Sequence, residues 1–114
     1  MPHPKGDLPV EWVTEDIIRQ YFNDGQFVEK LKSGQLVAHT KRSSHPNKPP
    51  RGEPICTWSQ IVYYCTLSGR TIAIVHQYLR PDGTIGASGL PDPKSLILKD
   101  KIISVRFKRP AGGS

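Results

Sequence analysis

Two β-rich runs, residues 58–67 and 70–79, flank Ser68-Gly69 and constrain the fold more than any other feature of the chain. Runs rich in β-branched and aromatic residues on either side of a glycine-containing turn predict an antiparallel hairpin. With a two-residue turn, Ile61 lies opposite His76. Both faces of this hairpin carry many apolar side chains. We therefore expect central strands that are covered on both faces, or covered on one face with the other offered to a partner.

A helix is predicted ahead of the hairpin, over residues 14–23. Thr14 is a suitable N-cap, and the apolar residues that follow recur at helical spacing. Asn23-Asp24-Gly25 supplies the stop. Residues 26–34 fit a short helix ended by Gly34 as well as a strand, and we favour a hairpin that turns at Ser33-Gly34. Residues 36–40 are a strand in either case.

The rest of the chain is rich in turn residues. Residues 1–12 predict an irregular N-terminal arm. Residues 41–54 hold four prolines in fourteen positions and predict a Pro-rich basic loop. Asp92-Pro93 resembles a helix start. Residues 102–107 predict a last strand, at an edge of the sheet, and residues 108–114 a flexible basic tail.

We therefore expect a single α+β domain over residues 13–107. In this fold the N-terminal helix packs on an antiparallel sheet of about four or five strands, with the hairpin at 58–79 in its centre.

The formal net charge of +6 is unevenly distributed. Residues 1–34 contain four basic and six acidic residues, whereas residues 35–114 contain twelve and four. A positive field of this kind favours an anionic partner such as nucleic acid or an acidic protein. No apolar run reaches the length of a membrane span, and the first residues lack the apolar core of a signal peptide. We expect a cytoplasmic protein with no membrane partner.

Cys56 and Cys65 predict no disulfide. Nine residues of extended chain place them roughly 30 Å apart, which is far beyond disulfide reach. Two reduced, buried thiols are expected. Neither cysteine has a CxxC neighbour, and His39, His45 and His76 show no metal-ligand spacing. We therefore expect no metal site and no cofactor.

Residues 76–94, HQYLRPDGTIGASGLPDPK, contain most of the residues that could carry chemistry. This run resembles a segment of short bacterial proteins of uncharacterised function, and the helix-then-hairpin order before it is similar to theirs. The resemblance implies no activity, but it points to this region of the chain.

An anion pocket is one interpretation of this segment. A strand that ends in His76, Tyr78 and Arg80 runs into a glycine-rich loop before a predicted helix start. Backbone N–H groups in the loop would point at a phosphate, and basic side chains would add charge. The candidate ligands are Arg80, Gly86, Ser88, Gly89 and Lys94. Alternatively, the glycines serve only tight turns and His76 is a hydrogen-bonded core residue.

A second candidate anion site is the Pro-rich basic loop over residues 41–54. Lys41, Arg42, Lys48 and Arg51 would lie along a phosphate backbone. Aromatic side chains would stack bases if they are exposed; the candidates are Trp12, Trp58, Tyr63 and Tyr64.

Three functions are consistent with these features. The first is a binding module for an anionic partner, with nucleic acid ahead of acidic protein. The second is a small metal-independent ribonuclease in which His76 is the base, Arg80 stabilises the phosphorane and Tyr78 shares their strand face. The third is a protein-interaction or oligomerising module that self-associates through the second apolar face of the hairpin.

Overall fold

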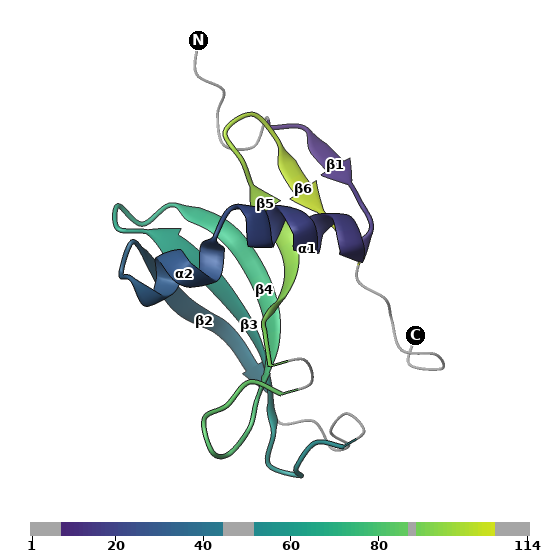
Figure 1. Cartoon of the computed structure of the whole chain (residues 1–114), viewed down its shortest axis with the longest axis vertical. Helices are drawn as coiled ribbons and strands as arrows, with labels where there is room; N and C mark the ends of the chain where they lie inside the picture. The colour runs from purple at the N-terminus through teal and green to yellow at the C-terminus, as the bar shows by residue number, and fades with distance from the viewer. Residues whose placement is uncertain (1–7, 45–51, 87–88, 107–114) are drawn as a thin grey trace.

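The two helices of the described residues lie on one face of a mixed sheet. The computed structural model describes residues 8–44, 52–86 and 89–106. Within these ranges six strands form one sheet in the order β1-β6-β5-β4-β3-β2 (Figure 1). The elements are β1 (Val10–Trp12), α1 (Glu15–Asp24), α2 (Phe27–Lys32), β2 (Leu36–Ser44), β3 (Trp58–Thr66), β4 (Thr71–Leu79), β5 (Asp92–Ile97) and β6 (Ile102–Ser104). All neighbours are antiparallel except β1 and β6. The predicted α+β class is confirmed, with six strands in place of four or five.

The central hairpin is confirmed, and its predicted register holds from the pair Trp58 and Leu79 to the pair Tyr64 and Ala73, with Ile61 paired with His76. The predicted two-residue turn is wrong, because the Thr66 N–H donates to the Arg70 carbonyl and three residues lie between them. Near the turn the register shifts, and Cys65 pairs with Thr71. The turn is closed by the Gly69 N–H, which donates to the Thr66 carbonyl at 2.9 Å. Gly69 has a φ of 95°, a conformation that favours glycine.

Helix α1 begins and ends close to the predicted positions. The Thr14 side chain accepts a hydrogen bond from the Ile17 N–H at 3.4 Å, which caps the first turn. Ile18 and Phe22 are buried against the sheet. The prediction of a hairpin at Ser33-Gly34 is wrong, because residues 27–32 form α2. Its Phe27 ring stacks on Phe22 with centroids 5.3 Å apart, so this segment is held by a contact between the helices.

Strand β2 is longer than the predicted strand and includes the first residues of the expected loop. Pairing with β3 continues to Ser44 and Ser59, past a bulge at Lys41. Residues 41–44 are therefore part of the sheet. Residues 45–51 of the predicted loop lie outside the described residues, as do residues 108–114 of the predicted tail.

Two predictions for the C-terminal third are wrong. Asp92 and Pro93 begin strand β5 rather than a helix. Pro93 is tolerated there because it lies at a register shift, where it pairs with Val75. Strand β6 is not at the edge, because β1 pairs with it in parallel. Part of the predicted N-terminal arm is thus an edge strand.

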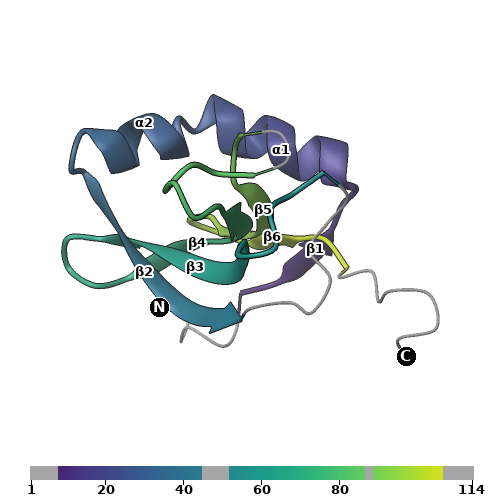
Figure 2. The same cartoon turned by 90° about the horizontal axis from the view of Figure 1, so that it is seen from below.

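The core lies between the helices and one face of the sheet. Its buried members include Ile18, Phe22, Phe27, Leu36, Val62, Tyr64, Ala73, Val75, Leu96, Ile103 and Val105. The opposite face carries no helix of the described residues (Figure 2), and we call it the open face. One row of paired residues crosses all six strands on this face: His39, Tyr63, Ile74, Ser95, Ser104 and Trp12. Within the described chain, no helix is long and apolar enough to span a membrane.

Candidate nucleic-acid interface

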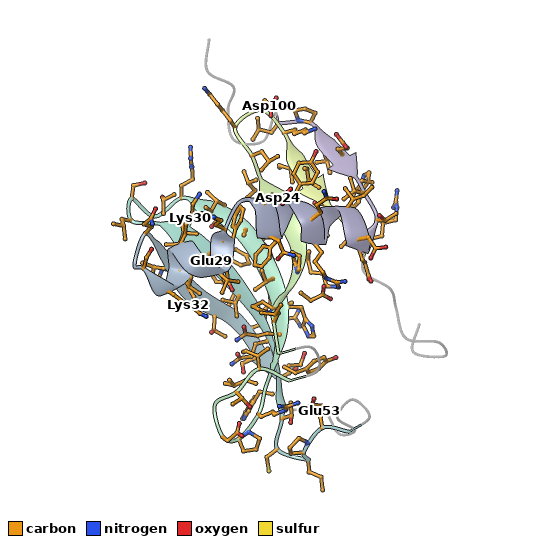
Figure 3. All side chains as sticks on the ribbon, viewed as in Figure 1. Asp24, Glu29, Lys30, Lys32, Glu53 and Asp100 are labelled. Atoms are coloured by element: carbon orange, nitrogen blue, oxygen red, sulfur yellow. The ribbon has the colours of Figure 1, made fainter. Side chains whose placement is uncertain are left out.

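Arg80, predicted as an anion ligand, is engaged by a carboxylate from a distant part of the chain. Its Nε and Nη2 donate to Glu53 Oε2 and Oε1 at 2.8 and 3.0 Å. The Glu53 side chain is only 5% exposed and lies at the end of the molecule where the β4–β5 connection turns (Figure 3). These hydrogen bonds raise the pKa of Arg80. The pair neutralises the Arg80 charge locally and ties residues 52–57 to the end of β4.

The backbone amides of the glycine-rich connection also have internal partners. The Gly86 N–H donates to the Tyr78 carbonyl at 2.6 Å, and the Gly89 N–H donates to the Gly86 carbonyl at 3.1 Å. A Cβ at Gly86 would lie 2.9 Å from the Glu53 carboxylate, so the ion pair requires glycine at this position. Ser88 lies outside the described residues. These two glycine amides therefore serve the fold of the connection.

Lys94, the other predicted cation of this pocket, is largely buried in a second ion pair. Its Nζ lies 2.9 Å from Asp92 Oδ2. The second carboxylate oxygen of Asp92 lies 3.4 Å from Arg19 of α1. Positive charge at Lys94 is thus balanced inside the fold, as it is at Arg80.

His76 is brought together with Tyr78 and Ser59. His76 Nε2 lies 2.8 Å from Ser59 Oγ, and the imidazole meets the Tyr78 ring edge-on, with centroids 4.7 Å apart. Burial lowers the pKa of His76, the positive charge of Lys94 lowers it further, and Asp92 opposes both effects. A neutral imidazole beside a serine hydroxyl fits a general base. For phosphoryl chemistry, however, the proposed electrophilic partner Arg80 is directed at Glu53.

Lys41 and Arg42 lie on the outer strand β2, where the bulge turns Lys41 toward the open face. The Lys41 Nζ lies 5.4 Å from the centroid of the Tyr63 ring. Arg42 pairs with Ile61 on the same face. Both cations are exposed. Lys48 and Arg51 lie outside the described residues.

A matching pair of side chains occurs at the other end of the open face. The Arg106 guanidinium lies 4.7 Å from the centroid of the Trp12 ring, and Trp12 is 54% exposed. Sequence reasoning identified Trp12 as a stacking candidate but missed Arg106 as its companion. Of the other ring candidates, Tyr64 is buried in the core and Trp58 is exposed.

The open face is poor in negative charge. Strands β2, β3, β4 and β6 contain no Asp or Glu, whereas β1 carries Glu11, which pairs with Lys101, and β5 carries Asp92, which pairs with Lys94. Four of the described carboxylates, those of Glu15, Asp16, Asp24 and Glu29, are instead on the helices, as Figure 3 shows for Asp24 and Glu29. This distribution leaves Lys41, Arg42 and Arg106 to dominate the field on the side away from the helices.

A cavity of about 560 Å³ lies between the helices and the β4–β5 connection. Its lining includes Phe22 and Leu90, two cations, Arg19 and Lys32, and two carboxylates, Glu29 and Asp92. The charges balance, so the cavity favours no ion of either sign.

Among the described residues, no group of three or more His, Cys, Asp or Glu side chains is placed to hold a metal ion. Comparisons with protein-family models, curated proteins and solved structures find no match for this chain.

Proposed function

We propose that this protein binds nucleic acid through the open face of its sheet. The observation that supports this most directly is the pairing of aromatic rings with cations on that face, Lys41 with the half-buried Tyr63 and Arg106 with the exposed Trp12. Cations supply affinity for phosphates, and aromatic rings offer surfaces on which bases stack. An acidic protein would use the cations but has no comparable need for the rings.

Charge-neutralising variants test the proposal. Lys41→Gln combined with Arg42→Gln removes two cations from the open face. Lys30→Gln combined with Lys32→Gln, a matched control, removes two from α2 on the other side of the sheet (Figure 3). Binding of fluorescein-labelled mixed-sequence RNA and DNA is measured by fluorescence anisotropy between low and moderate salt.

We expect wild-type affinity to fall steeply with salt. The open-face variant should bind more weakly and lose about 0.7 to 0.9 of the log–log salt slope per phosphate contact removed. The helix variant should bind almost as the wild type does. Absence of binding at low salt, or equal weakening by both double variants, would refute the proposal.

Self-association through the same face is the second candidate. Val10 and Val37 are exposed large hydrophobic residues on this face. Face-to-face packing of two copies would bury them. Light scattering across a range of protein concentrations separates the two functions, because a monomer at all concentrations contradicts self-association and leaves nucleic-acid binding intact.

A further inference from the structure

We propose that the ligand of the open face is single-stranded nucleic acid whose unpaired bases stack on Tyr63 and Trp12. This inference rests on the proposed function and specifies its substrate class. The rings of the two ring–cation pairs lie within one cross-strand row of the sheet.

Tyr63 and Trp12 belong to the same cross-strand row but lie near opposite ends of it. The row passes from β3 through β4, β5 and β6 to β1. Four strand spacings of about 4.8 Å place the two residues roughly 19 Å apart. Between them the row carries only uncharged side chains; Ile74 and Ser95 are half-buried, and Ser104 is buried. The row therefore forms an uncharged track with a ring and a cation at each end.

A single strand matches this arrangement better than a duplex does. In a duplex the bases are paired and stacked inside, so a flat sheet face meets mainly sugars and phosphates. The faces of Tyr63 and Trp12 can be used only by bases that are unpaired and turned toward the sheet. A basic face without rings would be sufficient for a duplex.

The cations have a second role in this arrangement. Lys41 lies 5.4 Å from its ring centroid, near the outer limit of a cation–π contact, on a flexible side chain. An arriving base takes the ring face, and the ammonium group moves to the adjacent phosphate. Arg106 does the same at Trp12. Each pair thus holds one nucleotide by its base and by its phosphate.

The spacing sets a minimum ligand length. At the 3.4 Å rise of stacked bases, roughly 19 Å corresponds to about six nucleotides, and an extended strand spans it with fewer. A dinucleotide should contact one ring only, whereas an eight-nucleotide strand should contact both.

The test uses the full chain and three fluorescein-labelled probes: an eight-nucleotide oligothymidylate, a thymidine dinucleotide, and a duplex with the same number of phosphates as the octamer. Tyr63→Leu and Trp12→Leu remove one ring each and keep an apolar side chain. Tyr21→Leu, an exposed aromatic on α1, is the matched control. Tyr63→Phe retains the ring and checks that binding is weakened only when the aromatic ring is removed.

We expect the octamer to bind more tightly than the duplex or the dinucleotide. Each leucine variant of the open face should weaken octamer binding by about 5- to 150-fold, which is the range for loss of one base–aromatic stack. Tyr63→Phe and Tyr21→Leu should bind almost as the wild type does.

A second readout is tryptophan fluorescence. In a Trp58→Phe background, where Trp12 is the only tryptophan of the chain, the octamer should quench tryptophan fluorescence. This readout is independent of whether the leucine variants fold.

The outcomes separate this inference from the proposed function. If the duplex binds as tightly as the octamer and fluorescence is unchanged, the single-strand inference is overturned, while salt-dependent binding through Lys41 and Arg42 stands. If no probe binds at low salt, both fail. Equal loss with Tyr21→Leu would overturn the stacking role of the open face.

Discussion

His76 should make the stability of the fold sensitive to mild acid. Burial and the charge of Lys94 lower the pKa of this imidazole in the folded protein, whereas the unfolded chain has the ordinary value of about 6.5. Below pH 6.5 the unfolded state therefore binds more protons than the folded state. The free energy of unfolding rises with pH through this window and falls as the pH drops below 6.5.

The change in the free energy of unfolding with pH is limited, because only one proton is involved. A single group contributes a slope of at most about 1.4 kcal/mol per pH unit between its folded and unfolded pKa values. The hydrogen bond to Ser59, 2.8 Å long, is not lost on protonation, because the hydroxyl can rotate from donor to acceptor. The cost comes instead from burying the charge and from repulsion by Lys94. Lys94→Gln should therefore reduce the acid sensitivity, since it removes the repulsion and leaves the Asp92 carboxylate.

Urea unfolding followed by circular dichroism at pH 5.5 and 7.5 measures the effect. Wild type should lose more stability at the lower pH than His76→Asn does. His39→Asn, which changes an exposed histidine on β2, should behave as wild type. A proton NMR titration of the histidine rings should place the His76 midpoint below 6.5. The reasoning fails if His76→Asn keeps the full acid sensitivity, or if that midpoint lies at or above 6.5.

Two further predictions concern the core and the thiols. Leu96→Ala, at a fully buried position of β5, should lower the free energy of unfolding by about 2 to 5 kcal/mol in urea titrations. Leu67→Ala, at a turn residue that is 74% exposed, should change it by no more than about 0.5 kcal/mol. The expectation of two buried thiols is wrong for Cys56, which is exposed, so a thiol reagent should modify Cys56 rapidly and the buried Cys65 only on unfolding. Rapid modification of two thiols in the folded protein would contradict this placement of Cys65.

The elements that could be predicted from the sequence are those with local signals. The N-cap at Thr14 and the apolar spacing after it determine α1, and the glycine turn determines where β3 reverses into β4. The register of most of this hairpin also depends on the shift between Tyr64 and Cys65. Residues 27–32 gave no such signal, because their helix is stabilised by Phe27 packing on Phe22 of another element. Local patterns do not report a contact between two helices.

Strand β5 shows how a local signal can mislead. Asp92-Pro93 has the composition of a helix start, yet Pro93 pairs with Val75 across the sheet and Asp92 forms ion pairs with Lys94 and Arg19. The position of β6 depended similarly on Val10–Trp12, a segment 90 residues away in the chain. Non-local pairing decided both cases.

The sequence pointed to a binding site at the glycine-rich loop, whereas the structure favours the open face as the candidate, and the reason is the pairing of charges. Near the glycine-rich loop the sequence shows cations at 80 and 94, but the Arg80 partner, Glu53, lies 27 residues earlier in the chain, so its neutralising effect could not be anticipated. Distance along the chain also hides the relation between Lys41 and Arg106. They lie far from each other in sequence, yet each stands over a ring of the same cross-strand row. Since Glu53 holds Arg80 and Asp92 holds Lys94 in ion pairs, the cations that the open face offers to a ligand are Lys41, Arg42 and Arg106.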